Sequence, residues 1–353
     1  MSISGASIPA TIDDVDAGWL SEATGMAVES LTHELIGVGI GVSSAVYRLS
    51  LTGDGVPPTM VLKLAALDEA AVFTASVLRM YEREVKFFDS VGPRSPIRVP
   101  KGYGGAMGED GATYYLLMED MGGNRSVDQI LGMEIVDAER AVEELAAWHA
   151  EFWGQAETFV ENGSAVSLAD PIYPAVLPTV FGEGLEKLQA GMELPASLRD
   201  AAALWPTVFE QLLARLSSSP TTLCHGDYRA DNIFFADDGS VVLLDFQLIG
   251  LGRAAFDFAY FVTQSLVADV AAAHEKELFD RYLAALLAAG VPEADTTDLW
   301  DDYKAAALFC LVYPVAASRG MDLDDPRQFD LLDNMNQRCA RAIEEHGLLD
   351  LRI

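Results

Sequence analysis

Residues 225–232 (HGDYRADN) and 243–247 (LLDFQ) constrain the fold of this chain more than any other part of its sequence. Between them lie a short apolar run and a DDGS segment, a pattern typical of a loop, a strand, a turn and a second strand. The loop turns back on itself, so Asp227 and Asn232 come close together, and Asp245 joins them from the adjacent strand. The chain must therefore fold so that two acids and an amide share one site.

Phosphoryl transfer to a hydroxyl group requires a set of this kind, because the protein mainly positions groups and neutralises charge in that reaction. One carboxylate must accept the proton of the attacking hydroxyl. Oxygen ligands must hold Mg²⁺ against nucleotide phosphates, and one or two side chains are enough because Mg²⁺ retains several waters. Asp227 is the predicted base, and Asn232 and Asp245 are the predicted magnesium ligands. Any one of them alone is more often an ordinary turn residue; their joint occurrence favours the site.

The same spacing resembles the H-x-D-x-x-x-x-N and D-F-G set of protein kinases, with Gly226 in place of their arginine and Gln247 in place of their glycine. A second segment agrees with it, because residues 39–46 (GIGVSSAV) fit G-x-G-x-x-G-x-V with a serine in the third glycine position. Such a loop lets backbone N–H groups approach phosphates, and serine hydroxyls can assist. The predicted nucleotide-binding residues in this segment are Gly39, Gly41, Ser43, Ser44 and Val46.

Lys63 lies in the apolar, strand-like run 60–64 (MVLKL) that follows the glycine-rich segment. One interpretation is an edge-strand lysine that points to water. The other places its ammonium group on the α- and β-phosphates, held by a carboxylate from a helix predicted over 77–91. Glu84 is the better partner because it lies close to the apolar face of that helix, whereas Glu82, the alternative, faces another side.

Residues 114–121 (YYLLMEDM) resemble the kinase strand that ends in the hinge between two lobes. The resemblance implies that Met118 abuts the adenine, while the backbone carbonyl of Glu119 and the backbone N–H of Met121 bond its edge. An ordinary core strand followed by a Gly-Gly turn fits the same residues equally well.

Short β-type runs between about residues 31 and 121 are interrupted by the one helical pattern at 77–91. After this part the pattern is mostly helical, apart from the hairpin described above. We therefore expect an α+β chain with a bilobal, protein-kinase-like fold. Residues 1–121 would form a small nucleotide-binding lobe with an antiparallel sheet and an N-terminal helical extension. Residues 122–353 would form a larger, mostly helical lobe for catalysis and substrate binding.

With these motifs the chain resembles the aminoglycoside phosphotransferase and choline kinase superfamily of small-molecule phosphotransferases, over about residues 35–261. The H-G-D-x-x-x-x-N form, with glycine after the histidine, is more typical of that group than of protein kinases. The resemblance implies that Asp257, in AAFDFAY, braces the catalytic loop. It also implies a structural role for His149, in LAAWHAEFW.

Two departures from the family pattern bear on the acceptor. Many members have D-L-H-P-G-N where this chain has D-Y-R-A-D-N, and its D-F-Q form resembles an ecdysteroid-kinase-like branch more than established antibiotic-resistance enzymes. An aminoglycoside or macrolide is therefore the alternative acceptor. Arg229 lies two residues after the predicted base, where protein kinases carry a lysine. We expect it to stabilise charge on the transferred phosphoryl group, the alternative being a salt bridge to Asp231.

The chain has 353 residues and a net charge of −31, from 23 Lys and Arg against 54 Asp and Glu. This charge disfavours nucleic acid or an anionic membrane as the main partner, so a nucleotide and a small hydroxylated molecule are expected instead. Since the nucleotide cleft must offset phosphate charge, the excess acid should lie over the helical surface or around the acceptor entrance. Residues 155–215 contain both acids and apolar side chains, which leaves a cationic acceptor and a lipid-like alcohol open.

No basic segment followed by an apolar run opens the sequence, and the apolar stretch 305–318 is too short to span a bilayer. Cys224, Cys310 and Cys339 form no CxxC pair, which disfavours a disulfide framework or a zinc site. These features predict a reduced, cytoplasmic protein, and they predict no particular oligomeric state.

Together the motifs predict a kinase that uses ATP or GTP with Mg²⁺ to phosphorylate a hydroxyl group of a small molecule. A nucleotide-binding pseudokinase or regulator without turnover is the alternative from another class, although nothing essential is missing from the motif set. Protein kinase activity is disfavoured, because the sequence has no A-P-E motif and the segment after Asp245 leads almost directly to Asp257.

Overall fold

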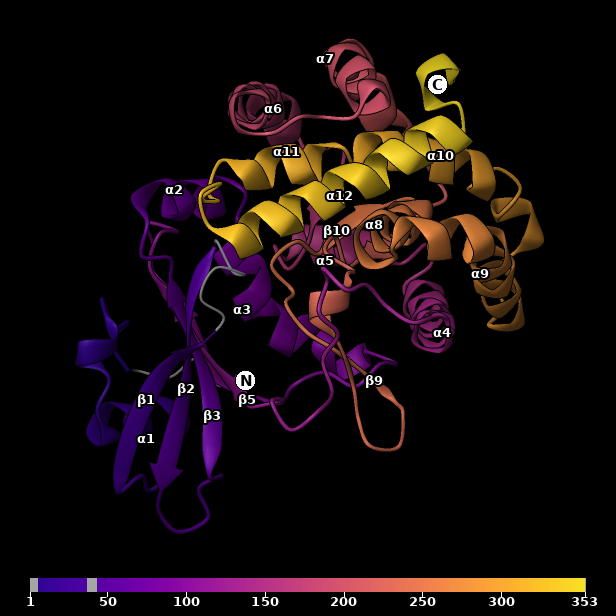
Figure 1. The fold of residues 1–353 in the computed structure, drawn as a ribbon. Coiled ribbons are helices and arrows are strands. Elements are labelled where there is room, and N and C mark those ends of the chain that lie inside the picture. Colours follow the sequence, from indigo (N-terminus) through magenta and orange to yellow (C-terminus); the bar gives the residue numbers. More distant parts are fainter. Residues whose placement is uncertain (1–5, 37–42, 353) are drawn as a thin grey trace.

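The computed structural model describes residues 6–36 and 43–352, and its N-terminal part is built on one five-stranded antiparallel sheet (Figure 1). The strand order is β1-β2-β3-β5-β4, which makes β3, the strand of Lys63, the central one. The bounds are β1 (Ser30–Ile36), β2 (Ser44–Thr52), β3 (Thr59–Ala65), β4 (Gly102–Met107) and β5 (Tyr114–Glu119). The predicted antiparallel sheet is confirmed, and Lys63 is not an edge-strand residue.

Helices cover both faces of the sheet, and two consecutive tyrosines of β5 each contact one of them. Successive side chains on a strand point to opposite faces. Tyr115 makes an edge contact with Trp19 of α1 (Ala17–Thr24), with ring centroids 5.0 Å apart. Tyr114 stacks on Tyr81 of α3 (Met80–Ser90), with centroids 4.0 Å apart. The second face thereby holds α3, the helix of Glu84, beside the strand that carries Lys63.

The helix predicted over 77–91 is present as α3, and a second helix, α2, precedes it. α2 (Glu69–Val77) begins after Asp68, whose side chain caps it, and α3 begins only at Met80. Between them Arg79 has the left-handed backbone conformation, with φ 54°, which an ordinary helix cannot include. The predicted helix is therefore confirmed as α3, with a later start at Met80, whereas the sequence does not predict the additional helix α2.

Beyond β5 the chain is mostly helical, and these helices surround one large apolar core, above and to the right of the sheet in Figure 1. They are α4 (Ile135–Glu151), α5 (Glu157–Glu161), α6 (Ile172–Gly191), α7 (Ala196–Leu216), α8 (Ala255–Ser265), α9 (Ala268–Ala288), α10 (Leu299–Phe309), α11 (Val312–Ser318) and α12 (Pro326–Glu345). A small sheet has the order β6-β10-β7, from β6 (Val166–Ser167), β7 (Thr222–Cys224) and β10 (Gly250–Gly252). The expected hairpin is present as β8 (Ile233–Phe235) and β9 (Val241–Leu243), which pair in an antiparallel arrangement.

The apolar stretch 305–318 forms parts of α10 and α11, and most of its side chains are buried in the core. Among the described residues, no helix is both long enough and apolar enough to cross a membrane. The three cysteines are buried and free of disulfide bonds, as their spacing predicts.

Candidate active site

The loop 225–232 starts where β7 ends, and α8 fixes its first two residues. Asp257 accepts backbone N–H groups through both oxygens, from His225 at 2.6 Å and from Gly226 at 2.8 Å. His149 Nε2 lies 3.1 Å from the same carboxylate. Gly226 has φ 82°, and a Cβ there would lie 2.1 Å from the carbonyl oxygen of Leu248, so only glycine fits. These contacts agree with the bracing role that the family resemblance implies for Asp257.

The imidazole of His225 joins this loop to the chain segment that carries Asp245. Its Nε2 lies 3.1 Å from the carbonyl oxygen of Leu244, and its Nδ1 lies 3.3 Å from the backbone nitrogen of Asp227. Burial lowers the pKa of His225, so the ring is neutral at physiological pH. A neutral ring with its proton on Nε2 satisfies both contacts, and it sets the spacing between the two acids.

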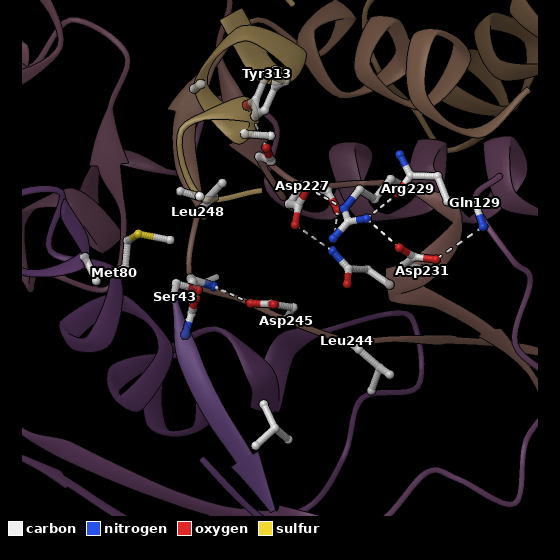
Figure 2. Close-up of a pocket in the computed structure, with 18 of the residues that line it drawn as sticks. Ser43, Met80, Gln129, Asp227, Arg229, Asp231, Leu244, Asp245, Leu248 and Tyr313 are labelled. Atoms are coloured by element: carbon white, nitrogen blue, oxygen red, sulfur yellow. Dashed lines mark hydrogen bonds and ion pairs between the residues drawn. The ribbon is translucent and has the colours of Figure 1, made fainter. Parts of the chain in front are cut away.

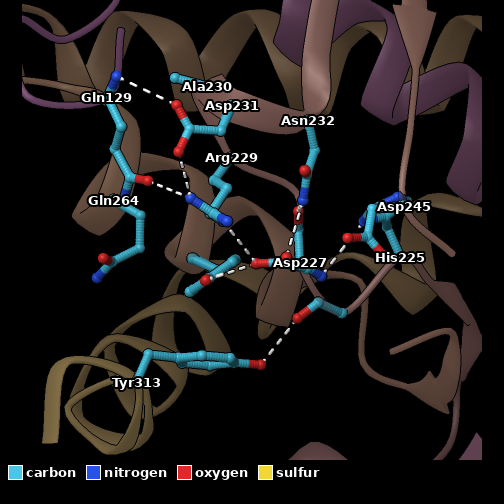
Figure 3. Close-up of polar contacts among 12 residues, drawn as sticks. Gln129, His225, Asp227, Arg229, Ala230, Asp231, Asn232, Asp245, Gln264 and Tyr313 are labelled. Carbon is cyan, nitrogen blue, oxygen red and sulfur yellow. Dashed lines mark hydrogen bonds and ion pairs between the residues drawn. The ribbon is translucent and has the colours of Figure 1, made fainter. Parts of the chain in front are cut away.

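The carboxylate of Asp227 is held by three side chains (Figure 3). Oδ1 accepts the hydroxyl of Tyr260 at 2.6 Å and Nε of Arg229 at 3.0 Å, while Oδ2 accepts Nδ2 of Asn232 at 2.8 Å. Burial raises the pKa of Asp227 above its ordinary value, although Arg229 and Tyr260 act in the opposite direction. A carboxylate with fixed orientation and raised proton affinity is suited to take a proton from a hydroxyl group.

Tyr260 has no local motif, and the sequence predicts no role for it. It lies three residues after Asp257 on α8, and residues three apart on a helix share a face. Both therefore point to the loop 225–232, one to its backbone and one to the carboxylate of Asp227. The position three residues after the bracing acid is the signal that could have identified Tyr260.

Arg229 contacts both Asp227, the predicted base, and Asp231, the alternative partner that the sequence suggests (Figure 3). Its Nε donates to Asp227, and its Nη1 donates to Asp231 at 2.6 Å and to the side-chain oxygen of Gln129. The salt bridge to Asp231 is thus present, and so is a guanidinium beside the carboxylate of Asp227. Because Arg229 has two acidic neighbours, it stays fully charged.

Lys63 and Glu84 form a buried ion pair between the central strand and α3, with Nζ 2.5 Å from Oε1. Burial alone would lower the pKa of Lys63, but Asp245 and Glu84 raise it to about 12, so the amine is protonated at neutral pH. Glu82 pairs instead with Lys86 at the surface, at 2.5 Å. The geometry therefore selects Glu84 over Glu82 as the partner of Lys63.

Gln247, which replaces the glycine of D-F-G, connects three parts of the site. Its Nε2 donates to Glu84 Oε2 at 2.9 Å and to Ser44 Oγ at 2.7 Å, and its Oε1 accepts the hydroxyl of Ser43. Ser44 also lies 2.6 Å from the hydroxyl of Tyr114. One amide thus ties the end of the glycine-rich segment to the Lys63–Glu84 pair, a contact that the sequence indicates only as a departure from the kinase pattern.

Asp245 follows β9 with a left-handed backbone, φ 64°, which turns its side chain out of the strand. Its Oδ1 lies 3.6 Å from Lys63 Nζ. Burial would raise the pKa of Asp245, but the nearby charges of Lys63 and Arg229 outweigh it and hold the pKa below its ordinary value. Asp245 is therefore an anion under all ordinary conditions.

One cavity of about 990 Å³ joins these groups (Figure 2). Of the predicted residues, those that border it are Ser43, Val46, Lys63, Met118, Glu119, Met121, Asp227, Arg229, Asn232 and Asp245. Ser44 and Glu84 do not border the cavity. Each contacts a residue that does: Ser44 accepts a hydrogen bond from Gln247, and Glu84 accepts one from Lys63. Gly39 and Gly41 lie outside the described residues. The cavity is at the upper end of the size range for ligand sites, which leaves room for two ligands side by side.

The donor atoms suit Mg²⁺, a hard cation that prefers oxygen. Asp245 offers an anionic carboxylate, and Asn232 uses Nδ2 for Asp227, so its amide oxygen is the atom it can offer to a metal. The protonated amine of Lys63 beside Asp245 suits the phosphates of a nucleotide. The residues present therefore fit both a magnesium ion and a nucleotide.

Known proteins share both the sequence pattern and the fold. The model of the Phosphotransferase enzyme family matches residues 34–300. The N-acetylmuramate/N-acetylglucosamine kinase of Caulobacter vibrioides is 34% identical over 112 residues. That alignment covers 30% of this chain and 29% of the kinase, so it spans less than a third of the curated relative.

Solved structures agree over most of the chain at low identity, which supports the fold. A mutant aminoglycoside 2′-phosphotransferase-IIIa bound to GDP has a TM-score of 0.57 at 15% identity, covering 88% of this chain and 92% of that one. Ethanolamine kinase of Plasmodium vivax has 0.55 at 14%, covering 90% and 83%. The amicoumacin kinase hAmiN, in complex with AMP-PNP, Ca²⁺ and Ami, has 0.53 at 13%, covering 87% of each chain. Since the family match runs from the sheet through the catalytic hairpin, the predicted resemblance is confirmed, and the chain belongs to the Phosphotransferase enzyme family, a group of small-molecule kinases.

Proposed function

We propose that this protein transfers the γ-phosphoryl group of ATP or GTP to a hydroxyl group of a small molecule. The observation that carries the proposal is the convergence of Asp227, Asn232, Asp245 and Lys63 on one cavity, from three separate elements of the fold. We further propose that residues 1–121 bind the nucleotide, and that residues 122–353 supply the catalytic groups and the acceptor pocket.

In this proposal Asp227 orients the acceptor hydroxyl and accepts its proton. Its raised pKa favours that transfer, and Tyr260 and Asn232 keep its two oxygens in place. Lys63, protonated and held by Glu84, binds phosphate oxygens of the nucleotide. Mg²⁺ bound by Asn232 and Asp245 would neutralise part of the phosphate charge.

Arg229 has a second role in the proposal, because its guanidinium lies beside the carboxylate that accepts the proton of the attacking hydroxyl. As an ion held by two acids it can stabilise the negative charge of the phosphoryl group during transfer without reorganising. Met118, Glu119 and Met121 border the cavity beside β5, where we propose that they contact the base of the nucleotide.

The named relatives support a nucleotide and a hydroxylated acceptor. Two of the similar structures are complexes with GDP and with AMP-PNP and Ca²⁺, and the curated relative is named as a kinase of amino sugars. A nucleotide-binding protein without turnover is the weaker candidate, because the base, the metal ligands and the lysine pair are all present together in the structure.

The test is transfer of label from γ-labelled ATP or GTP, with Mg²⁺, to a panel of hydroxylated compounds, with mass spectrometry of the products. Formation of a phosphate ester that requires both nucleotide and Mg²⁺ is the expected result. Nucleotide binding without any phosphorylated product across the panel would contradict the proposal and favour the regulatory alternative.

Replacement of Tyr260 by phenylalanine should move the acid limb of the pH profile of kcat/KM to higher pH. The base must be deprotonated, so activity falls as the pH drops through the pKa of Asp227. The hydroxyl of Tyr260 stabilises the anion, and its removal raises that pKa further. Tyr313→Phe is the matched control, because Tyr313 donates to the carbonyl of Gly226 and not to the carboxylate. Identical acid limbs for Tyr260→Phe and the unaltered protein would show that Asp227 is not the titrating base.

Replacement of Gln247 by alanine should raise the KM for the nucleotide by roughly five- to thirtyfold, because hydrogen bonds worth about 1–2 kcal/mol in total are lost. The substitution removes the hydrogen bonds that Gln247 donates to Ser44 and to Glu84. Initial rates at varied nucleotide concentration measure the effect, with exposed Gln337→Ala as the control. An unchanged nucleotide KM would exclude this positioning role.

A further inference from the structure

The part of the cavity that lies beyond Asp227, away from the sheet, is walled by apolar side chains. One wall is α6, which presents Tyr173, Val176, Leu177 and Val180 to the cavity. These residues are three or four apart and thus share one face of the helix. All four are only partly buried, although they are apolar or aromatic and lie inside the molecule. Their exposed parts border the cavity.

α11 packs directly against α6 and extends the same lining. It contributes Val312, Tyr313, Ala316 and Ala317, where the two alanines leave space rather than fill it. Met80, at the start of α3, and Leu248, after β9, close the side nearest to Ser43, as Figure 2 shows. The polar groups labelled in Figure 2 cluster at Asp227, Arg229 and Gln129. In the apolar part, the Tyr313 hydroxyl donates to the carbonyl of Gly226, and Arg319 pairs with Glu183.

The acids that border the cavity are already engaged. Each such carboxylate among the described residues either lies within ion-pair distance of a cation or caps a helix. The pairs are Asp120 with Arg48 (2.7 Å), Glu119 with Arg98 (3.2 Å), Asp128 with Arg327 (3.0 Å), Asp231 and Asp227 with Arg229 (2.6 and 3.0 Å) and Asp245 with Lys63 (3.6 Å), and Asp68 caps α2. The net charge of −31 therefore does not extend to the acceptor pocket as free carboxylates.

We infer that the acceptor is an uncharged, predominantly apolar alcohol, whose hydroxyl lies at Asp227 and whose carbon skeleton packs against the cavity-lining side chains of α6 and α11. The inference rests on the proposed function and narrows its substrate class. A polycation would lose its hydration without gaining free carboxylates, which is costly. A free sugar would bury several hydroxyl groups against side chains that cannot bond them. An apolar skeleton gains free energy from the same walls.

Binding is measured first, so that it does not depend on turnover. The protein with Mg²⁺ and AMP-PNP is titrated by calorimetry with estradiol, farnesol and 1-adamantanemethanol as apolar alcohols, with kanamycin as a polycation, and with N-acetylglucosamine as a neutral sugar. At least one apolar alcohol should bind about tenfold or more tightly than either polar compound. Tighter binding of kanamycin or N-acetylglucosamine than of every apolar alcohol overturns the inference.

A charge placed on the α6 wall tests the location. Val176→Asp should weaken binding of the best apolar alcohol by about tenfold or more and leave AMP-PNP affinity unchanged. Ala175→Asp adds the same charge to the exposed face of the same helix and should change neither affinity. Unchanged AMP-PNP affinity also shows that each variant is folded. Equal effects of the two substitutions on alcohol binding would exclude α6 as the wall of the site.

The two proposals fail in different ways. If apolar alcohols bind as expected but none is phosphorylated, the phosphotransfer function is wrong for this class and the pocket assignment stands. If phosphate is transferred efficiently to kanamycin or N-acetylglucosamine and not to the apolar alcohols, the enzyme function stands and the substrate class is wrong.

Discussion

Asparagine in place of Asp227 is expected to lower the rate constant for phosphoryl transfer by roughly 10²–10⁴-fold, the usual contribution of a positioned base. The amide has nearly the same shape as the carboxylate, but it cannot accept the proton of the hydroxyl. Single-turnover transfer from labelled nucleotide measures the chemical step directly, and thermal shift with Mg-nucleotide checks that binding is retained.

The control for this substitution is Asp237→Asn, in the exposed turn between β8 and β9. It removes one negative charge from the same hairpin without touching the cavity. A transfer rate for Asp227→Asn within a factor of a few of the unaltered protein would show that another group accepts the proton.

Replacement of Asp245 by asparagine should lower metal-dependent turnover by roughly 10²–10³-fold, the scale seen when one preorganised electrostatic contact to the transition state is removed. Asparagine is the informative choice because it tolerates the left-handed φ of 64° at this position, so that the effect reports the lost charge rather than backbone strain. Loss of the anion also leaves Lys63 with only Glu84 as its acidic neighbour.

A titration of turnover with Mg²⁺ distinguishes this effect from that of the base. Asp245→Asn should require much higher Mg²⁺ for half-maximal rate, whereas Asp227→Asn should have a low rate at an ordinary Mg²⁺ requirement. If Asp245→Asn keeps both the rate and the Mg²⁺ dependence of the unaltered protein, Asp245 is not a metal ligand.

The sheet, the helical remainder and the hairpin of the site could be predicted because each leaves a local signal. Strand alternation marks β2, a short apolar run marks β3, and the loop 225–232 has a fixed spacing of polar residues between apolar runs. The pairing of Lys63 with Glu84 could also be anticipated, since the helix face that meets the sheet is readable from its apolar residues.

The contacts that could not be predicted join residues far apart in the chain. Tyr260 and Asp227 are 33 residues apart, and Gln247 and Glu84 are 163 apart, so no periodicity connects them. The break at Arg79 depends on one backbone angle. The apolar lining of the acceptor pocket arises only when α6 and α11 come together in the fold, and neither helix by itself indicates a pocket.

All eleven residues of α8 are buried, and this helix carries both Asp257 and Tyr260. A segment buried along its whole length opens only when the domain unfolds, so it belongs to the least mobile part of the molecule. Asp227 is held to that helix through the backbone of His225 and Gly226 and through its own Oδ1. If Asp227 is the base that we propose, any closing motion must bring the nucleotide and the acceptor to a stationary carboxylate, with the sheet or the acceptor helices as the moving parts.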